Sequence, residues 1–242
     1  MTDTVVITGA SQGIGLATAR MLADDGWKVI GMARSDHGAE FPGELVRVDL
    51  SDIDATEAAL KGIAERHAVD AVVNNVGFNV IEPVGAVDLG HFARVIDMNL
   101  RTTVQVTQAF LPGMKERRYG RIVNLSSRGA LGRAGRTSYG AAKAGVIGMT
   151  RTWALELAGH AITANVVSPG PTATEMFRRN NLTGPGAAER ERAFLADVAM
   201  NRFGEPEEIA FGIRFFLDRR ASFVTGQILH VCGGSSVGPA AL

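Results

Sequence analysis

Short apolar runs alternate with longer amphipathic stretches along almost the whole chain. The runs predict β-strands, and the stretches, whose apolar residues recur at helical spacing, predict α-helices. The predicted strands span residues 4–8, 28–32, 45–48, 70–74, 121–125, 162–167 and 227–231. The predicted helices span residues 14–25, 51–67, 88–98, 100–117, 138–158 and 206–218, with Ser51 or Asp52 as the cap of the second. This alternation predicts an α/β protein.

The predicted strands in the middle of the chain are almost entirely apolar. Such strands are buried on both faces, which indicates a seven-stranded parallel sheet covered by helices on each side. We see no internal repeat or linker, so residues 1–242 are predicted to form a single domain. Residues 175–204 are the one irregular stretch, and we interpret them as a mobile substrate lid or as a plain surface insertion.

Charge and cysteine content narrow the functional classes. Lysine plus arginine and aspartate plus glutamate are 25 each, so no basic excess favours nucleic acid or an anionic membrane. Cys232 is the only cysteine, which excludes an intrachain disulfide and suggests a reducing compartment. The chain shows no signal peptide, no membrane-spanning apolar run and no metal-ligand cluster. We therefore expect a cytoplasmic protein without a metal.

A glycine-rich turn joins the first predicted strand to the first helix. It reads Thr8-Gly-Ala-Ser-Gln-Gly-Ile-Gly15, and its glycines allow close backbone approach to a ligand. The N-terminus of the following helix offers free N–H groups and a positive dipole, which favour a phosphate. The residues expected there to bind a cofactor are Gly9, Ser11, Gln12, Gly13, Ile14 and Gly15.

The same turn also fits the nucleophile elbow of hydrolases, with Ser11 as the nucleophile. A hydrolase needs an oxyanion N–H from the loop of an earlier strand, and no strand precedes this one. Among the histidines only His230 comes late in the chain, and it lies in a predicted strand. Serine hydrolase therefore stays a minor alternative.

The end of the second strand bears on the choice of dinucleotide. An acidic residue at this point would bind a ribose 2′-hydroxyl, but the sequence has Arg34 and Ser35, which can bind a 2′-phosphate. The sequence therefore favours NADP(H) over NAD(H). Asp36 nearby keeps NAD(H) open, and Gln12 stands where a basic residue would have strengthened the NADP(H) prediction.

Tyr139 and Lys143 lie four residues apart on a predicted helix, so their side chains share one face. A lysine cation beside a phenol favours the phenolate and lowers the tyrosine pKa toward the working range. Tyr139 is then suited to proton transfer near neutral pH.

Together these motifs resemble the short-chain dehydrogenase/reductase family, in particular its β-ketoacyl carrier-protein reductase-like members. The similarity spans nearly the whole chain, with Asn74-Asn-Val-Gly77, Ser126-Ser127 and Ser168-Pro-Gly170 in the order that the family shows. The resemblance implies a Rossmann-type doubly wound sheet, a nicotinamide cofactor and a small-molecule carbonyl or alcohol substrate. It also implies a homo-oligomer, either a tetramer or a dimer.

The resemblance further assigns roles to individual residues. Tyr139 would be the general acid/base, Lys143 would bind the nicotinamide ribose, and Asn99 would anchor a water that links Lys143 to solvent. The remaining cofactor-binding residues implied by the family are Asp49, Leu50, Asn75, Gly77, Pro169, Gly170, Thr172 and Thr174.

The catalytic serine is either Ser126 or Ser127, because adjacent strand residues point to opposite faces and both cannot serve. Counting back from Tyr139 by the family's spacing selects Ser126, whereas counting from the start of the strand selects Ser127. We prefer Ser127 with a loop one residue shorter, because loops absorb deletions more easily than strands do.

Substrate identity does not follow from the sequence. Arg128 follows the serine pair and could bind an anionic substrate group, or it could be an exposed arginine. A third class, a cofactor-binding protein without turnover, is disfavoured by the presence of Asn99, Tyr139 and Lys143.

Overall fold

The computed structural model describes residues 2–36 and 40–238. Within these residues one parallel sheet has the strand order β3-β2-β1-β4-β5-β6-β7. The strands are β1 (Thr4–Thr8), β2 (Lys28–Ala33), β3 (Glu44–Arg47), β4 (Ala71–Asn74), β5 (Gly120–Leu125), β6 (Ile162–Pro169) and β7 (Ile228–Val231). The predicted seven-stranded, doubly wound sheet in a single domain is confirmed, with strand ends that differ from the prediction by at most two residues.

The strand order reverses at β1, which pairs in parallel with β2 on one side and with β4 on the other. The chain therefore leaves β1 and β4 toward opposite edges of the sheet, and a crevice opens between their carboxyl ends. The site described below lies at this position.

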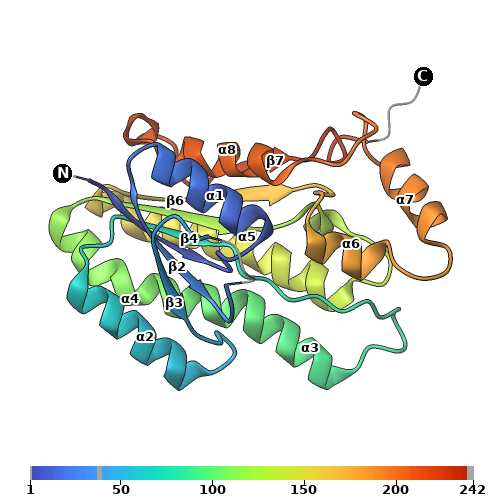
Figure 1. The fold of residues 1–242 in the computed structure, drawn as a ribbon, viewed down its shortest axis with the longest axis horizontal. Coiled ribbons are helices and arrows are strands. Elements are labelled where there is room, and N and C mark those ends of the chain that lie inside the picture. Colours follow the sequence, from blue (N-terminus) through green and yellow to red (C-terminus); the bar gives the residue numbers. More distant parts are fainter. Residues whose placement is uncertain (1, 37–39, 239–242) are drawn as a thin grey trace.

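Helices cover both faces of the sheet (Figure 1). One layer contains α1 (Gly13–Asp24) and α8 (Pro206–Leu217). The other contains α2 (Ile53–Arg66), α3 (Leu89–Ile96), α4 (Thr102–Arg117) and α5 (Thr137–Leu157). Asp52 caps α2 as predicted, because its Oδ1 accepts the backbone N–H of Ala55 at 2.9 Å.

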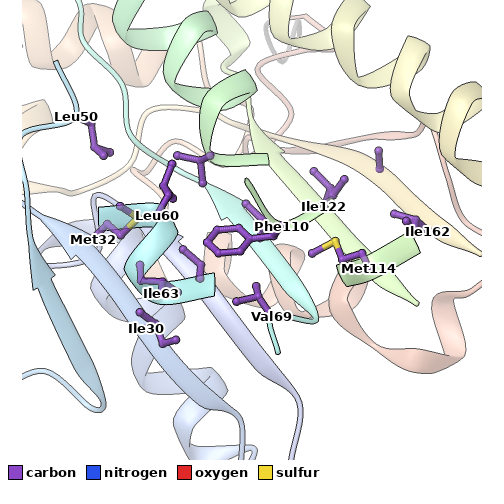
Figure 2. Packing of buried hydrophobic residues seen from close by; sticks show 14 of the residues in the cluster. Ile30, Met32, Leu50, Leu60, Ile63, Val69, Phe110, Met114, Ile122 and Ile162 are labelled. Atoms are coloured by element: carbon purple, nitrogen blue, oxygen red, sulfur yellow. The ribbon is translucent and has the colours of Figure 1, made fainter. Parts of the chain in front are cut away.

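Two hydrophobic clusters hold the layers together, one on each face of the sheet. The side chains of β1 alternate between them: Val6 packs with Phe110 and Met114 of α4, whereas its neighbours Val5 and Ile7 pack under α1 and α8. Figure 2 shows the first cluster, where Phe110 lies among the side chains of several strands and helices. Burial on both faces explains the apolar strand sequences.

Residues 88–117 differ from the prediction of two separate helical pieces. A π-helical turn, η1 (Asp97–Arg101), joins α3 to α4 without a break. Thr102 and Thr103 of α4 bond their hydroxyls back to the carbonyls of Met98 and Asn99 in this turn. The extra residue of a π turn rotates the side chains that follow it, and such turns frequently occur at functional sites.

Residues 175–204 are more regular than predicted. They form α6 (Glu175–Asn181) and α7 (Ala187–Ala196) at the carboxyl end of the sheet (Figure 1). Thr174 caps α6 by accepting the Phe177 N–H, and the ring of Phe177 packs edge-on against the rings of Phe194 and Phe203. This small aromatic cluster supplies the apolar contacts that the helices need.

Three single-turn 3-10 helices complete the described structure: η2 (Arg128–Leu131), η3 (Ala158–His160) and η4 (Arg219–Ala221). A search for membrane-crossing helices among the described residues finds no helix that is long and apolar enough.

Candidate active site

A cavity of about 430 Å³ opens at the carboxyl ends of the strands. It receives residues from the loops after β1, β2, β3, β4, β5 and β6 and from α5 and α6. The predicted site residues that line it are Gly9, Ser11, Gln12, Gly13, Ile14, Arg34, Asp49, Leu50, Asn75, Gly77, Ser127, Tyr139, Lys143, Pro169, Gly170, Thr172 and Thr174. The fold thus brings together residues that are far apart in the sequence.

Three predicted site residues do not line the cavity. Gly15 packs beneath the turn, where a Cβ would stand 2.2 Å from the carbonyl oxygen of Gly9, so its role is close helix–strand packing. Ser35, the residue after Arg34, is half-buried. Asn99 lies behind the cavity wall in the π turn and is buried.

The glycine-rich turn has the shape of a phosphate cradle. Gly9 and Gly13 adopt positive φ angles of 63° and 52°, which other residues rarely adopt. Gln12 occupies the N-cap of α1 but makes no side-chain cap hydrogen bond, so the first N–H groups of the helix remain available to a ligand. The arrangement therefore fits the diphosphate of a dinucleotide.

Asn75 fixes this turn against β4. Its Nδ2 donates to the carbonyls of Thr8 and Gly9 at 3.0 and 3.1 Å, and the Thr8 hydroxyl accepts the N–H groups of Asn75 and Val76. Because these bonds cross the reversal point of the sheet, they hold the crevice at a fixed width.

Arg34 and Asp49 form a charged end of the cavity. Two hydrogen bonds from Ser51 hold the pKa of the Asp49 carboxyl below its usual range, and the cations of Arg34 and Arg94 lower it further. The Asp36 carboxylate, which the sequence kept open as a ribose partner, is bonded by Arg47. Arg34 is exposed, follows the end of the second strand and lines the cavity.

Tyr139 and Lys143 share one face of α5, with the Lys143 Nζ 5.7 Å from the centre of the Tyr139 ring. Nζ donates to the Leu125 carbonyl at 2.8 Å, and burial lowers the pKa of Lys143 to about 8. Burial also raises the pKa of Tyr139, although a hydrogen bond with Ser127 and the charge of Arg136 oppose this effect. In the protein alone, therefore, desolvation outweighs the predicted lowering of the tyrosine pKa.

The two candidate serines have different partners. Ser126 is buried, and its hydroxyl donates to the Lys143 carbonyl at 2.8 Å. Ser127 lies at the cavity with its hydroxyl beside that of Tyr139, and it also accepts the Gly129 N–H at 3.0 Å. The geometry therefore pairs Ser127, and not Ser126, with the Tyr139 phenol.

Asn99 is oriented by the π turn. Its Nδ2 donates to the carbonyls of Phe78 and Val95, both at 2.8 Å. Its Oδ1 is buried and accepts no hydrogen bond from any described residue. A Cβ placed on Gly77 would lie 3.2 Å from this Oδ1 and 3.4 Å from the Lys143 Nζ. Both polar atoms thus border the same small space next to Gly77, where only a glycine fits without a shift.

Three arginines from the segment before α5 line the cavity, and the sequence analysis singles out only the first of them. Arg128 bonds the carbonyls of Ser235 and Gly132. Arg133 packs its guanidinium 3.8 Å above the ring of Phe194. Arg136, directly before α5, is almost fully buried. Three arginines within nine residues of the segment before Tyr139 were the signal that could have identified them.

The hydrolase alternative finds no support at Ser11. In the described part of the chain, no histidine lines the cavity that contains this serine. Cys232 lies outside the cavity, with its Sγ 3.1 Å from the Ser236 hydroxyl. Cys232 is buried and lies close to the backbone of Gly170, so we interpret it as a packing residue.

Comparison with known proteins identifies relatives along the whole chain. A family model described as enoyl-(acyl carrier protein) reductase matches residues 9–236. The 3-oxoacyl-(acyl-carrier-protein) reductase of Vibrio cholerae is 37% identical over 238 residues, which cover 95% of both chains. The enzyme of the same name from Thermotoga maritima is 37% identical over 241 residues, 95% of this chain and 96% of its own.

Solved structures agree with these relatives. The ligand-free aldohexose dehydrogenase of Thermoplasma acidophilum superposes with a TM-score of 0.92 at 30% identity, covering 100% of this chain and 96% of its own. A levodione reductase superposes with a TM-score of 0.91 at 30% identity, covering 97% and 98%.

Proposed function

The chain belongs to the short-chain dehydrogenase/reductase family and is an NAD(P)-dependent oxidoreductase, and we propose that it interconverts a ketone and a secondary alcohol with NADP(H) in preference to NAD(H). One observation supports this reaction above the others. A single cavity joins the Ser127–Tyr139–Lys143 cluster to a glycine-rich phosphate cradle and to Arg34.

The side chains divide the chemistry between them. The bound nicotinamide supplies or accepts the hydride. Ser127 holds the carbonyl oxygen by its hydroxyl, and Tyr139 gives that oxygen a proton during reduction and takes it back during oxidation. The raised pKa of Tyr139 keeps the phenol protonated, which suits it to the direction of reduction. The reductase names of the relatives support the same direction.

Lys143 and Asn99 support the proton transfer by Tyr139. The Lys143 ammonium is placed to bind the nicotinamide ribose and to favour the Tyr139 phenolate once that ribose is present. The free Oδ1 of Asn99 and the Lys143 Nζ border one small space, which suits a water that passes protons toward solvent.

Binding of the cofactor uses the cradle and its rim. The N–H groups at the start of α1 would hold the diphosphate, Asp49 and Leu50 would border the adenine, and Thr172 and Thr174 would border the carboxamide and phosphate side; all four side chains line the cavity. Arg34 with Ser35 receives the 2′-phosphate, and this choice is supported by the pairing of Asp36 with Arg47. Helices α6 and α7, within residues 175–204, act as a lid over the substrate.

We test this proposal by following nicotinamide fluorescence while the protein is titrated with NADPH and with NADH, for wild type, Arg34→Ala and Tyr139→Phe. We expect wild type to prefer NADPH, and Arg34→Ala to weaken NADPH about 10- to 100-fold because a charge-assisted contact is lost. Tyr139→Phe should bind cofactor normally and lose about 10²- to 10⁴-fold in ketone turnover.

A preference for NADH would contradict the role of Arg34 but not the oxidoreductase reaction. Binding of neither nucleotide would overturn the reaction itself. A cofactor-binding protein without turnover would bind NADPH, yet show no ketone reduction that Tyr139→Phe could remove.

A further inference from the structure

Arg136 is a buried cation beside the proposed reaction centre. It is only 9% exposed, lines the cavity and occupies the N-cap of α5, three residues before Tyr139. Its charge is close enough to oppose the rise in the Tyr139 pKa. A guanidinium in this position is part of the substrate's surroundings.

The hydrogen bonding of this guanidinium is incomplete. Nη2 donates to the Oδ1 of Asn181, in α6, at 2.7 Å. Nη1 is buried and finds no acceptor among the described residues. A buried donor without a partner is costly, and a buried charge without a counter-charge is more so, which is why nearly all such groups have partners.

No carboxylate of the described residues forms an ion pair with Arg136. Glu82 is the nearest candidate by backbone, since its N–H bonds the Gly135 carbonyl. Its Oε1 bonds the His91 Nδ1 at 2.6 Å, and its Oε2 is buried without a hydrogen-bond partner among the described residues, so neither oxygen bonds Arg136. Asp197 lies 3.6 Å from Arg133 instead. Tyr139 and Arg133 are the groups whose charges act on Arg136, and burial lowers its pKa.

The lining of the cavity is predominantly cationic. Five cationic side chains line it in addition to Arg34, whereas its acidic lining residues are Asp49, at the adenine end, and Glu175. The five are Arg94, Arg128, Arg133, Arg136 and Lys143. Arg128 bonds two carbonyl oxygens and Arg133 pairs with Asp197. Arg136 differs from both because it is almost fully buried and its Nη1 has no acceptor among the described residues.

We propose that Arg136 binds a carboxylate carried by the substrate, so that the enzyme acts on oxo acids and hydroxy acids in preference to neutral ketones and alcohols. The proposal rests on the reaction proposed above. The carboxylate completes the hydrogen bonding that Asn181 supplies only in part, and the N-terminal end of α5 adds a favourable dipole. This assigns to Arg136 the role that the sequence had suggested for Arg128.

The distance from Arg136 to Tyr139 limits the substrate's length. The two residues are separated by one helical turn, so the carboxylate and the reacting carbonyl belong to one short molecule. A ligand that places an anion at Arg136 is thereby held with its carbonyl at Ser127 and Tyr139. Orientation of this kind raises the rate as well as the affinity.

The test compares short oxo acids, from 2-oxopropanoate to 5-oxohexanoate, with their methyl esters as substrates for NADPH-dependent reduction. We expect wild type to prefer at least one acid over its ester. In Arg136→Gln, kcat/KM for that acid should fall about 10- to 100-fold, largely through KM, while the value for the ester changes less than about threefold. Arg136→Lys should recover part of the loss.

Arg151→Gln is the matched control, because Arg151 is an exposed arginine of the same helix outside the cavity. It removes the same charge and should leave the acid-to-ester ratio unchanged. If kcat/KM falls equally for acid and ester in Arg136→Gln, the proposal is overturned. The role of Arg136 would then be structural, through its hydrogen bond to Asn181 of α6.

If Arg136→Gln does not fold, inhibition of the wild-type enzyme tests the carboxylate site instead. Inhibition of ester reduction by propanoate but not by propanamide supports the carboxylate site, and equal inhibition or none overturns it. Reduction of neutral ketones with no preference for any acid would overturn the carboxylate site alone, whereas no reduction of any ketone would overturn the proposed function.

Discussion

At the scale of single residues, burial governs the protonation of the proposed catalytic pair. Lys143 is only 3% exposed, and burial lowers its pKa from 10.5 to about 8. The same burial raises the pKa of Tyr139, because a phenolate is costly where water is excluded. The Tyr139 phenol therefore keeps its proton, whereas the Lys143 ammonium loses its proton more readily than that of an exposed lysine.

The Lys143 pKa has a consequence for stability. Between pH 8 and 10.5 the unfolded lysine still binds a proton that the folded one has lost, so this group makes the free energy of unfolding rise with pH. From pH 8 to about 9.5 we expect wild type to gain about 1–2 kcal/mol relative to Lys143→Met. Urea unfolding of both proteins at the two pH values measures this gain.

Subtracting the methionine variant removes the contributions of other titrating groups, including Tyr139. A difference between the two proteins that does not change with pH would show that Lys143 keeps an ordinary pKa. A difference that changes in the opposite direction would mean that the folded protein stabilises the ammonium.

At the scale of elements, the end of β5 decides which serine faces the cavity. Side chains alternate along a strand, so Ser126 and Ser127 point in opposite directions. Ser126 bonds the carbonyl of Lys143 and so ties β5 to α5, whereas Ser127 faces Tyr139. The segment that follows forms η2, which sets how many residues separate the strand from α5.

Replacing each serine by alanine separates the two roles. Ser127→Ala should lower kcat for ketone reduction about 10²- to 10³-fold, because the carbonyl oxygen loses its hydrogen-bond donor. Its stability should fall by only about 1 kcal/mol, from the lost cap bond to the Gly129 N–H. Ser126→Ala should lower the free energy of unfolding by about 1–3 kcal/mol, because a buried carbonyl loses its donor. Steady-state kinetics and urea unfolding of both variants give the answer, and the reverse assignment of effects would refute our choice of Ser127.

At the scale of the whole molecule, some large apolar side chains remain on the surface. Phe223 is 101% exposed, and Phe211 and Phe215 of α8 are 62% and 49% exposed. Leu155, near the end of α5, is 84% exposed. Phe211 and Phe215 lie four residues apart on one face of α8. Exposed apolar groups gathered on one face mark interaction surfaces in soluble proteins, and a second copy of the chain is the partner that the family resemblance implies.

We therefore predict a homo-oligomer, dimer or tetramer, that depends on the region of Phe223. Phe223→Asp should shift the protein toward smaller species, because a charge would have to be buried at the contact. Light scattering after size-exclusion chromatography measures the mass. Ala58→Asp, which introduces the same single negative charge at an exposed position of α2, is the control, and a monomeric wild type would contradict the prediction.

Much of the fold could be predicted from local sequence patterns. The apolar runs identified all seven strands, because strands buried on both faces leave a signal that needs no knowledge of neighbours. The Tyr139–Lys143 spacing placed both side chains on one face of α5, because helix geometry is itself local. The π turn at Asn99 could not be predicted from the sequence. It depends on hydrogen bonds within the folded chain, and no spacing of apolar residues marks it.

The composition and motifs of the chain were enough to determine an α/β parallel sheet, a nicotinamide-type phosphate turn and membership of a family, since each rests on a short pattern. Only the tertiary structure decided that Ser127 meets Tyr139, that burial raises the tyrosine pKa, and that the buried Nη1 of Arg136 has no acceptor among the described residues. These three facts depend on which groups the folded chain desolvates together. Desolvation is a property of the packed whole, and residues as far apart as Arg136 and Asn181 become neighbours only there.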